Sequence, residues 1–251
     1  MAVPYDFYNY PKFWQGREYE DEAEKIALKK FFLKIPKKDS LIDIGGGFGR
    51  LAEVYAPVFK HSLLVDPSEK LLNIAQKNLK KFKNIEFRKG RGERLPGQDG
   101  SFDVALMIRV VHHLQNPQKV FLEASRVLKP NGFLILEFAN KIHFRARLRA
   151  WIRGDFGFTS NLEPSDQRSL ESIAASTIPF LNHHPQFIYR ELEKAGFKVS
   201  SSLSVSNFRH PLVKKIIPLP ILLFLEKYFS LLSSHFSPFF GPSIFVLCQK
   251  T

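Results

Sequence analysis

The sequence lacks several features that would assign it to a secreted or membrane-spanning class. It has one cysteine, Cys248, among 251 residues, so no internal disulfide can form, which fits a reducing compartment. Residues 1–10 are aromatic and polar rather than basic and then apolar, so they predict no signal peptide. No apolar run reaches the length of about 18 residues that a membrane span requires. We therefore expect a cytoplasmic protein.

Acidic residues are scarce relative to basic ones. The chain has 24 aspartates and glutamates against 37 lysines and arginines, which gives a formal net charge of +13. This excess attracts anionic partners, either nucleic acid or phospholipid, although a lysine-rich surface also favours solubility alone. The apolar content of 44% is ordinary for a globular protein. The length allows one large domain or two small ones.

Apolar segments alternate with helical patterns from residue 40 onward. This order predicts an α/β fold with a doubly wound, mostly parallel sheet. In such a sheet, ligands bind at the carboxyl ends of the strands. After a first strand from residue 41, we expect strands at residues 61–66, 85–88, 104–108, 132–138, 197–205 and 243–249. We expect helices at residues 20–34, 69–82, 117–128 and 186–195.

Residues 41–51, LIDIGGGFGRL, are the most informative segment. They predict a buried strand, a tight glycine turn and the start of a helix. Gly45, Gly47 and Gly49 let the backbone pass close under a ligand, because a Cβ would block the approach. Their spacing differs from the dinucleotide-binding fingerprint, and Asp43 adds an acid that nicotinamide and flavin folds do not require. A glycine turn that merely joins a strand to a helix is the structural alternative.

A second acid ends the next predicted strand. Asp66 is the last residue of the segment 61–66, and in doubly wound sheets an acid at this point accepts hydrogen bonds from ribose hydroxyls. Each such bond contributes roughly 1.5–3 kcal/mol. Asp66 also precedes Pro67 and Ser68 at the start of a helical pattern, so helix capping is a second and compatible role.

A third segment, residues 90–104, has the sequence GRGERLPGQDGSFDV. It resembles the run acid-Ala-Glu-x-Leu-Pro-Phe-x-Asp-x-Ser-Phe-Asp of the type 11 family of class I S-adenosylmethionine-dependent methyltransferases, which includes quinone-ring and sterol methyltransferases. The resemblance spans residues 41–138 in four motifs, the last at residues 111–114. It implies a Rossmann-like, seven-stranded sheet whose last strand is antiparallel, and S-adenosyl-L-methionine as the cofactor. The cofactor-binding residues that it implies are Asp43, Gly45, Gly46, Gly47, Gly49, Asp66, Pro67, Gly92, Glu93 and Arg109.

Two positions depart from the family pattern. Arg91 stands where the family usually has an acid that accepts a hydrogen bond from the adenine amino group, and arginine has no acceptor. Adenine recognition then depends on the Gly92 backbone, on stacking near residues 67–68, or on Glu93. Arg109 stands where the family usually has a small or polar residue. Its side chain reaches the cofactor carboxylate, a substrate anion or solvent.

The sequence does not identify a catalytic base. Methyl transfer from a sulfonium is an in-line displacement in which alignment supplies much of the rate, so a base is needed only where the acceptor loses a proton. Helix starts are the structural alternative for two of the candidate sites, at residues 113 and 183–184. Adjacent histidines do not converge on one ion and no acidic cluster accompanies them, so we expect no metal. The candidate bases are His112, His113, His143 and His184.

Two segments extend beyond a cofactor core of about residues 40–140. Residues 141–180 begin with a helical pattern whose apolar face is flanked by arginines, and we expect a lid that suits an amphiphilic or anionic acceptor. Residues 207–242 form an insert in which Pro218 and Pro220 prevent one continuous helix. Its apolar residues and nearby lysines predict peripheral contact with an anionic membrane, or packing on the sheet or a second chain. The aromatic N-terminal segment either covers the cofactor mouth or packs on the sheet edge.

These features predict a single methyltransferase domain, residues 1–251, that methylates oxygen or carbon of a small-molecule or lipid-like acceptor. A nucleic-acid methyltransferase is the first alternative, because of the net charge. However, the Asn/Asp-Pro-Pro-aromatic run of amino-group enzymes and the cysteine of cytosine-carbon enzymes are both absent after the fourth strand. A cofactor-binding module without catalysis is the second alternative, because Arg91 breaks the pattern and no base is evident. The oligomeric state is left open.

Overall fold

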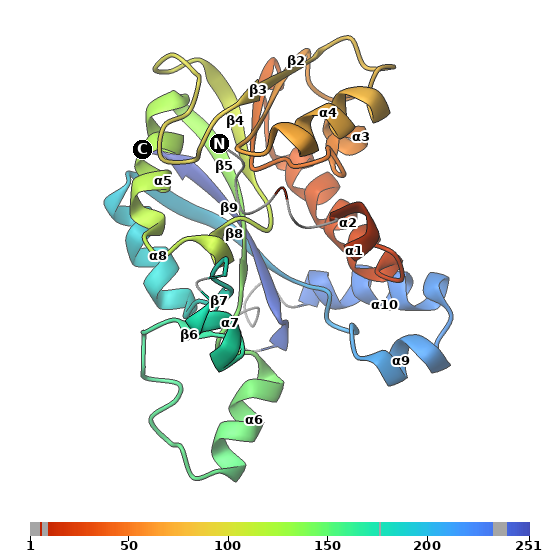
Figure 1. The fold of residues 1–251 in the computed structure, drawn as a ribbon, viewed down its shortest axis with the longest axis vertical. Coiled ribbons are helices and arrows are strands. Elements are labelled where there is room, and N and C mark those ends of the chain that lie inside the picture. Colours follow the sequence, from red (N-terminus) through yellow and green to blue (C-terminus); the bar gives the residue numbers. More distant parts are fainter. Residues whose placement is uncertain (1–5, 7–9, 176, 233–239) are drawn as a thin grey trace.

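A computed structural model describes residues 6, 10–175, 177–232 and 240–251 of the chain (Figure 1). Part of the aromatic N-terminal segment (residues 1–5 and 7–9) and the last part of the insert (residues 233–239) lie outside the described residues. The centre is a seven-stranded sheet with the order β3-β2-β1-β4-β5-β9-β8. Its strands are β1 Ser40–Ile44, β2 His61–Asp66, β3 Ile85–Lys89, β4 Phe102–Met107, β5 Leu128–Ala139, β8 Phe197–Val205 and β9 Ser243–Lys250.

The sheet has the predicted, mostly parallel topology. β1 pairs in parallel with β2 and β4, and these pair in parallel with β3 and β5. β9 lies between β5 and β8 and is antiparallel to both. The strand order reverses beside β1, which creates a crevice outside the carboxyl ends of β1 and β4. The doubly wound, seven-stranded fold with an antiparallel last strand is thereby confirmed.

Helices cover both faces of the sheet (Figure 1). On one face, three helices pack against residues such as Leu41 and Leu64, and on the other face two helices pack against Ile42 and Leu63. Neighbouring residues of a strand point to opposite faces, so each strand contributes to two cores and needs a continuous apolar sequence. The first layer contains α2 Glu18–Lys34, α3 Ala52–Tyr55 and α4 Glu69–Asn78, and the second α5 Pro117–Val127 and α8 Pro185–Lys194.

Most predicted bounds agree with the structure to within two residues, and the start of β5 and the end of α4 differ by four. β5 begins at Leu128 rather than at residue 132, because Leu128 already pairs with Phe102 of β4, and the strand continues through Asn131, where φ is 61°. β4 begins at Phe102 and ends at Met107, before the left-handed backbone of Arg109. α4 ends at Asn78 rather than at residue 82.

The lid segment, residues 141–180, contains more regular structure than expected. The helix predicted at its start is present, and a second helix and a two-stranded antiparallel ribbon follow. Lys141 joins the start of the segment to its middle, because its Nζ donates to the carbonyls of Asn161 and Glu163 at 2.8 and 2.7 Å. The elements are α6 Phe144–Ile152, α7 Leu170–Ala174, β6 Ser165–Asp166 and β7 Leu181–Asn182.

The insert folds as two helices, α9 Pro211–Ile216 and α10 Leu219–Leu232, separated at Pro218 as predicted. One face of α10 packs on α2 and buries Glu226. Glu226 accepts hydrogen bonds from the Tyr19 hydroxyl at 2.6 Å and from the Ser206 N–H at 2.8 Å. Within the described part of the chain, no helix has the length and apolar character needed to cross a membrane.

Removal of the Tyr19 hydroxyl is expected to loosen the insert. Tyr19→Phe takes one donor from the buried Glu226 carboxylate and leaves the Phe208 N–H, which donates to the Tyr19 oxygen at 2.9 Å, without its acceptor. We expect the free energy of unfolding, measured by urea denaturation, to fall by about 1–3 kcal/mol. Tyr228→Phe, on the exposed face of α10, is the matched control and should change it by less than about 0.5 kcal/mol. Equal losses in both variants would contradict this anchoring role.

Candidate active site

The glycine turn after β1 requires a backbone that glycine adopts most readily. Gly45, Gly47 and Gly49 have φ angles of 73°, 55° and 78°. An added Cβ on Gly45 would lie 2.5 Å from Cγ2 of Val110, and one on Gly49 would lie 2.4 Å from Cδ1 of Leu79. The turn is therefore in close contact with the end of β4 and with α4. At Gly47, in contrast, an added Cβ would meet nothing nearer than 3.9 Å, so the turn is open on that side.

Asp66 ends β2 directly beside this turn. Its Oδ2 accepts from the Gly47 N–H at 2.9 Å, and its Oδ1 accepts from the Ser68 N–H at 2.8 Å. Each oxygen keeps a further lone pair for a ligand hydroxyl. Burial raises the pKa of Asp66 to about 6, although the two backbone N–H groups oppose this rise. The cap of α4 is Ser68 rather than Asp66, because the Ser68 hydroxyl accepts from the Leu71 N–H at 3.1 Å.

Asp43 lies beneath the turn, where its side chain and backbone are 4% exposed. A Cβ on Gly46 would approach the Asp43 carboxylate to 2.6 Å. Burial raises the pKa of Asp43 to about 7, and the neighbouring Tyr55 hydroxyl opposes this rise. Among the described residues no ion pair involves Asp43, and the charge of Arg50 is the weakest of the influences on its pKa, so this carboxylate is suited to a positively charged ligand group.

Residues 90–101 join β3 to β4 without an intervening helix. Gly92 lies against α5, because an added Cβ would be 2.8 Å from Cγ1 of Val120. The side chains of Arg91 and Glu93 are exposed, and the Arg94 N–H closes a turn onto the Arg91 carbonyl at 3.1 Å. The Gly92 backbone is thus held close to the body of the protein, while the side chains on either side of it are exposed.

Arg109 follows β4 with a φ of 59°, which is uncommon for a residue with a side chain. Its N–H donates to Glu137 Oε2 at 2.9 Å, and its guanidinium donates to Glu24 Oε1 from Nε at 2.7 Å and from the second terminal nitrogen at 2.6 Å. Burial opposes the charge of Arg109, but Glu24 and Glu137 outweigh it and raise the pKa of Arg109. The sequence left three partners open for the Arg109 side chain, namely the cofactor carboxylate, a substrate anion and solvent. An acid of α2 was not among them.

Three residues that bring the N-terminal part of the chain onto the site were not predicted from the sequence. Arg50, at the end of the glycine turn, pairs with Asp21 and Glu24 of α2. The Trp14 ring lies over the guanidinium of Arg50, 3.7 Å from its central carbon, and 4.9 Å from that of Arg109. An acid within the otherwise apolar face of α2 was the available signal for Glu24. Arg50 and Trp14 carried no comparable signal.

A cavity of about 330 Å³, here called the basic cavity, opens at the carboxyl ends of β4 and β5. Its lining residue Arg109 precedes Val110, whose side chain packs against Gly45, so the cavity wall and the glycine turn are joined through these residues. From the end of the sheet it is lined by Arg109, His112 and Glu137; from the start of the lid segment by His143, Arg145 and Arg149; and from the chain after β8 by Arg209.

Two of the four candidate histidines, His112 and His143, line the basic cavity, and the other two do not. Burial, reinforced by nearby positive charges, lowers the pKa of His143 to about 4 and that of His112 well below its ordinary value, so both are neutral at pH 7. His113 donates from Nδ1 to the Pro179 carbonyl at 2.8 Å. His184 caps α8, because its Nδ1 accepts a backbone N–H of the first turn at 3.1 Å.

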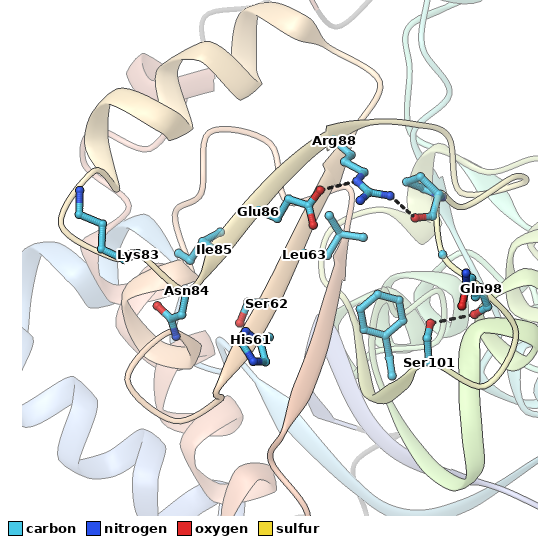
Figure 2. Close-up of a pocket in the computed structure, with 13 residues that line it drawn as sticks. His61, Ser62, Leu63, Lys83, Asn84, Ile85, Glu86, Arg88, Gln98 and Ser101 are labelled. Carbon is cyan, nitrogen blue, oxygen red and sulfur yellow. Dashed lines mark hydrogen bonds and ion pairs between the residues drawn. The ribbon is translucent and has the colours of Figure 1, made fainter.

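A larger hollow, of about 560 Å³, lies over the first residues of β2 and β3 (Figure 2). Figure 2 shows Arg88 between Glu86 and the Pro96 carbonyl, and the Ser101 hydroxyl bonded to the Gln98 carbonyl. Neither Asp66 nor the glycine turn lines it. Because ligands of doubly wound sheets bind at the carboxyl ends of the strands, we do not place the cofactor in this hollow.

Comparison with known proteins relates this geometry to one class of enzyme. Residues 42–136 match the family described as "Methyltransferase domain". A demethylmenaquinone methyltransferase from Tropheryma whipplei is 32% identical over 171 residues, which cover 67% of this chain and 70% of the relative. A malonyl-[acyl-carrier protein] O-methyltransferase from Marinomonas is 26% identical over 167 residues, which cover 64% of this chain and 61% of the relative.

A solved structure supports the same fold over nearly the whole chain. It is an S-adenosylmethionine-dependent methyltransferase from Thermotoga maritima, described as a possible histamine N-methyltransferase. Its TM-score is 0.62 at 22% identity, and the alignment covers 96% of this chain and 95% of that one. The fold and the sequence matches thus define a class I S-adenosylmethionine-dependent methyltransferase. The chain belongs to the type 11 family of these enzymes, and S-adenosyl-L-methionine is its cofactor.

The residues around the glycine turn fit this cofactor. Asp66 keeps acceptors for the ribose hydroxyls, and Asp43 offers a buried negative charge to the methionine ammonium. Gly47 leaves open space between them. Pro67 and Gly92 follow the ends of β2 and β3, on the side expected for the adenine. We retain these residues as the predicted cofactor site.

Asp43→Asn is expected to stabilise the protein without cofactor while weakening cofactor binding. A carboxyl whose pKa is about 7 when folded and 3.8 ordinarily makes the fold less stable as pH rises between these values. The variant escapes this loss, so at pH 8 it should melt at a higher temperature than the wild type, and the difference should shrink toward pH 4. Calorimetry should show an S-adenosylmethionine dissociation constant about tenfold larger or more.

Asp39→Asn is the matched control for this prediction, because Asp39 is an exposed acid just before β1. It should change neither the pH dependence of melting nor cofactor affinity. Wild-type affinity in Asp43→Asn would contradict the role given to Asp43.

Proposed function

We propose that this enzyme transfers a methyl group to an oxygen or carbon atom of a small or lipid-like acceptor held in the basic cavity. The position of the cavity carries the proposal, because its wall at Arg109 adjoins Val110 and the glycine turn. An acceptor bound there lies next to the methionine end of the cofactor site. The relatives named as a demethylmenaquinone methyltransferase and a malonyl-[acyl-carrier protein] O-methyltransferase support a lipid-like acceptor.

The residues of the chain mainly align the two substrates. When bound, the cofactor supplies an activated methyl group, so correct placement contributes much of the rate. Asp66 and Asp43 hold its ribose and methionine ends. Glu137 fixes the cavity wall by accepting from the Arg109 N–H. His112 and His143 line the cavity as neutral imidazoles, which makes them the two candidates for accepting a proton from an acceptor hydroxyl.

Asp66→Ala tests this function. The change removes the acceptor of the ribose hydroxyls and the partner of the Gly47 N–H. Calorimetric affinity for S-adenosylmethionine should fall about tenfold or more, with an unchanged circular dichroism spectrum. The wild type should form S-adenosylhomocysteine when given a cellular lipid extract, and the variant should not. Asp99→Ala, at an exposed acid far along the loop before β4, should behave as the wild type.

Two outcomes would overturn parts of this proposal. Turnover with RNA but not with lipid extract would replace the acceptor class by nucleic acid, the alternative that the net charge of +13 favours. Cofactor binding without turnover on RNA or lipid extract would show that the protein is a binding module rather than an enzyme.

We also propose that the protein contacts an anionic membrane through an apolar rim on α6, α9 and α10. Figure 1 shows α6 and α9 at the lower end of the molecule, with α10 beside α9. Arg147 of α6 and Lys215 flank these residues, and a basic residue adds about 1 kcal/mol at an anionic surface. Lys214 contributes less than expected, because it pairs with Glu20 at 2.9 Å. The rim consists of the exposed residues Phe144, Leu148, Trp151, Ile152, Leu212, Ile216, Ile221, Phe224, Leu225 and Tyr228.

Liposome flotation tests the apolar rim. The wild type should float at low salt with liposomes that contain phosphatidylglycerol, and should bind less at high salt or with neutral lipid. Trp151→Ser combined with Ile216→Ser should abolish flotation. Leu33→Ser, at an 86% exposed leucine of α2 outside the rim, is the matched control and should float normally. A wild-type chain that ignores anionic liposomes would show that the rim is a contact between protein surfaces.

A further inference from the structure

The basic cavity is lined by more positively charged residues than negatively charged ones. Glu137 is the acid among the lining residues, and it already accepts from the Arg109 N–H. Three further arginines line the cavity, Arg145, Arg149 and Arg209, and none of them forms an ion pair within the ranges that the structure describes. Three guanidinium groups therefore face one space without an ion pair of their own, and Glu137 and Glu20 act on Arg209 only at longer range.

His143 shows that the three arginines lie around a common point. Burial, and after it the charges of Arg209, Arg149 and Arg145, lower the pKa of His143 to about 4. Arg145, Arg149 and Arg209 are all exposed, so their guanidinium groups remain accessible to a ligand in the cavity. Two of the arginines come from α6 and the third from the chain between β8 and α9, so the cluster is more than the solvated face of one helix.

On the basis of the proposed methyl transfer, we propose that the acceptor carries an anionic group, a carboxylate or a phosphate, that Arg145, Arg149 and Arg209 bind. The planar guanidinium matches both groups in paired hydrogen bonds. The other walls of the cavity include Arg109 and His112 after β4 and Glu137 of β5, near the predicted methionine end of the cofactor, together with Gln167, Phe180 and Asn182 of residues 141–180. An acceptor whose anion is bound near α6 therefore presents another part of itself to the methyl donor. The anion is a recognition group and not the methylated atom.

Anion binding is also expected to change the pKa of His143, a candidate base that lines the cavity. A negative charge among the three arginines offsets their repulsion of a proton on His143, so the pKa of His143 rises toward its ordinary value of 6.5. The other ionisable groups that line the cavity are Arg109, His112 and Glu137. An acceptor without the anion leaves His143 a weaker base.

The first test measures the melting temperature of the full chain with inorganic phosphate and with trifluoroacetate, a carboxylate that stays ionised in mild acid. Chloride keeps the ionic strength constant. Both anions should raise the melting temperature of the wild type. The triple variant Arg145→Gln, Arg149→Gln, Arg209→Gln should lose this rise and, because three repelling charges are gone, should melt no lower than the wild type without anion. Arg153→Gln, at the exposed end of α6 outside the cavity, should respond as the wild type.

The second test follows the His143 imidazole by NMR, with its signal assigned by His143→Gln. Phosphate should raise the His143 pKa by about one unit or more in the wild type and leave it unchanged in the triple variant. No response of the wild type to either anion, or an equal response of the triple variant, would overturn the proposal. A response to one anion alone supports the proposal and identifies the group. Unchanged S-adenosylmethionine affinity of the triple variant separates failure of this site from failure of the enzyme's proposed function.

Discussion

The arrangement of the active site depends on one buried carboxylate, that of Glu24. Its fully buried side chain binds Arg50, which ends the glycine turn, and Arg109, which follows β4. Removal of one partner from such a pair leaves an uncompensated buried charge, at a cost of roughly 3–5 kcal/mol. A single helix thus holds together two chain segments at the predicted cofactor site, and Trp14 covers both guanidinium groups. These contacts also explain how Arg109 keeps its left-handed backbone.

The parts of the site that the sequence predicted are those built from neighbouring residues. The glycine turn, Asp43 and Asp66 follow short strands that are buried on both faces, and such strands need apolar runs that are easy to recognise. The contacts that were missed join distant parts of the chain. Glu24 and Arg109 are 85 residues apart, and Tyr19 and Glu226 are 207 apart, so no local pattern indicates either pair.

The basic cavity could be predicted from the sequence only in part. The arginines of α6 were visible in the sequence as the flanks of an apolar helix, but the pattern could not show which of them face inward. Arg145 and Arg149 lie four residues apart and so share a helix face. Their third partner, Arg209, comes from beyond β8, and only the fold brings it to them. The candidate histidines show the same difference. The helix-capping role of His184 follows from neighbouring residues, whereas only the fold places His112 in the cavity.

Helices α6 and α10 each combine an exposed apolar surface with residues that serve another purpose. This combination links the proposed membrane contact to the proposed anionic acceptor. α10 buries Leu222 and Glu226 against the body while Phe224 and Tyr228 stay exposed, so it is anchored and still offers an apolar surface. α6 has arginines that line the basic cavity and apolar residues on its exposed side. An anionic amphiphile at a bilayer surface combines both kinds of group: its head is an anion and its tail is apolar. The same helix then contacts the membrane that holds such an acceptor and the charged group by which the acceptor is recognised.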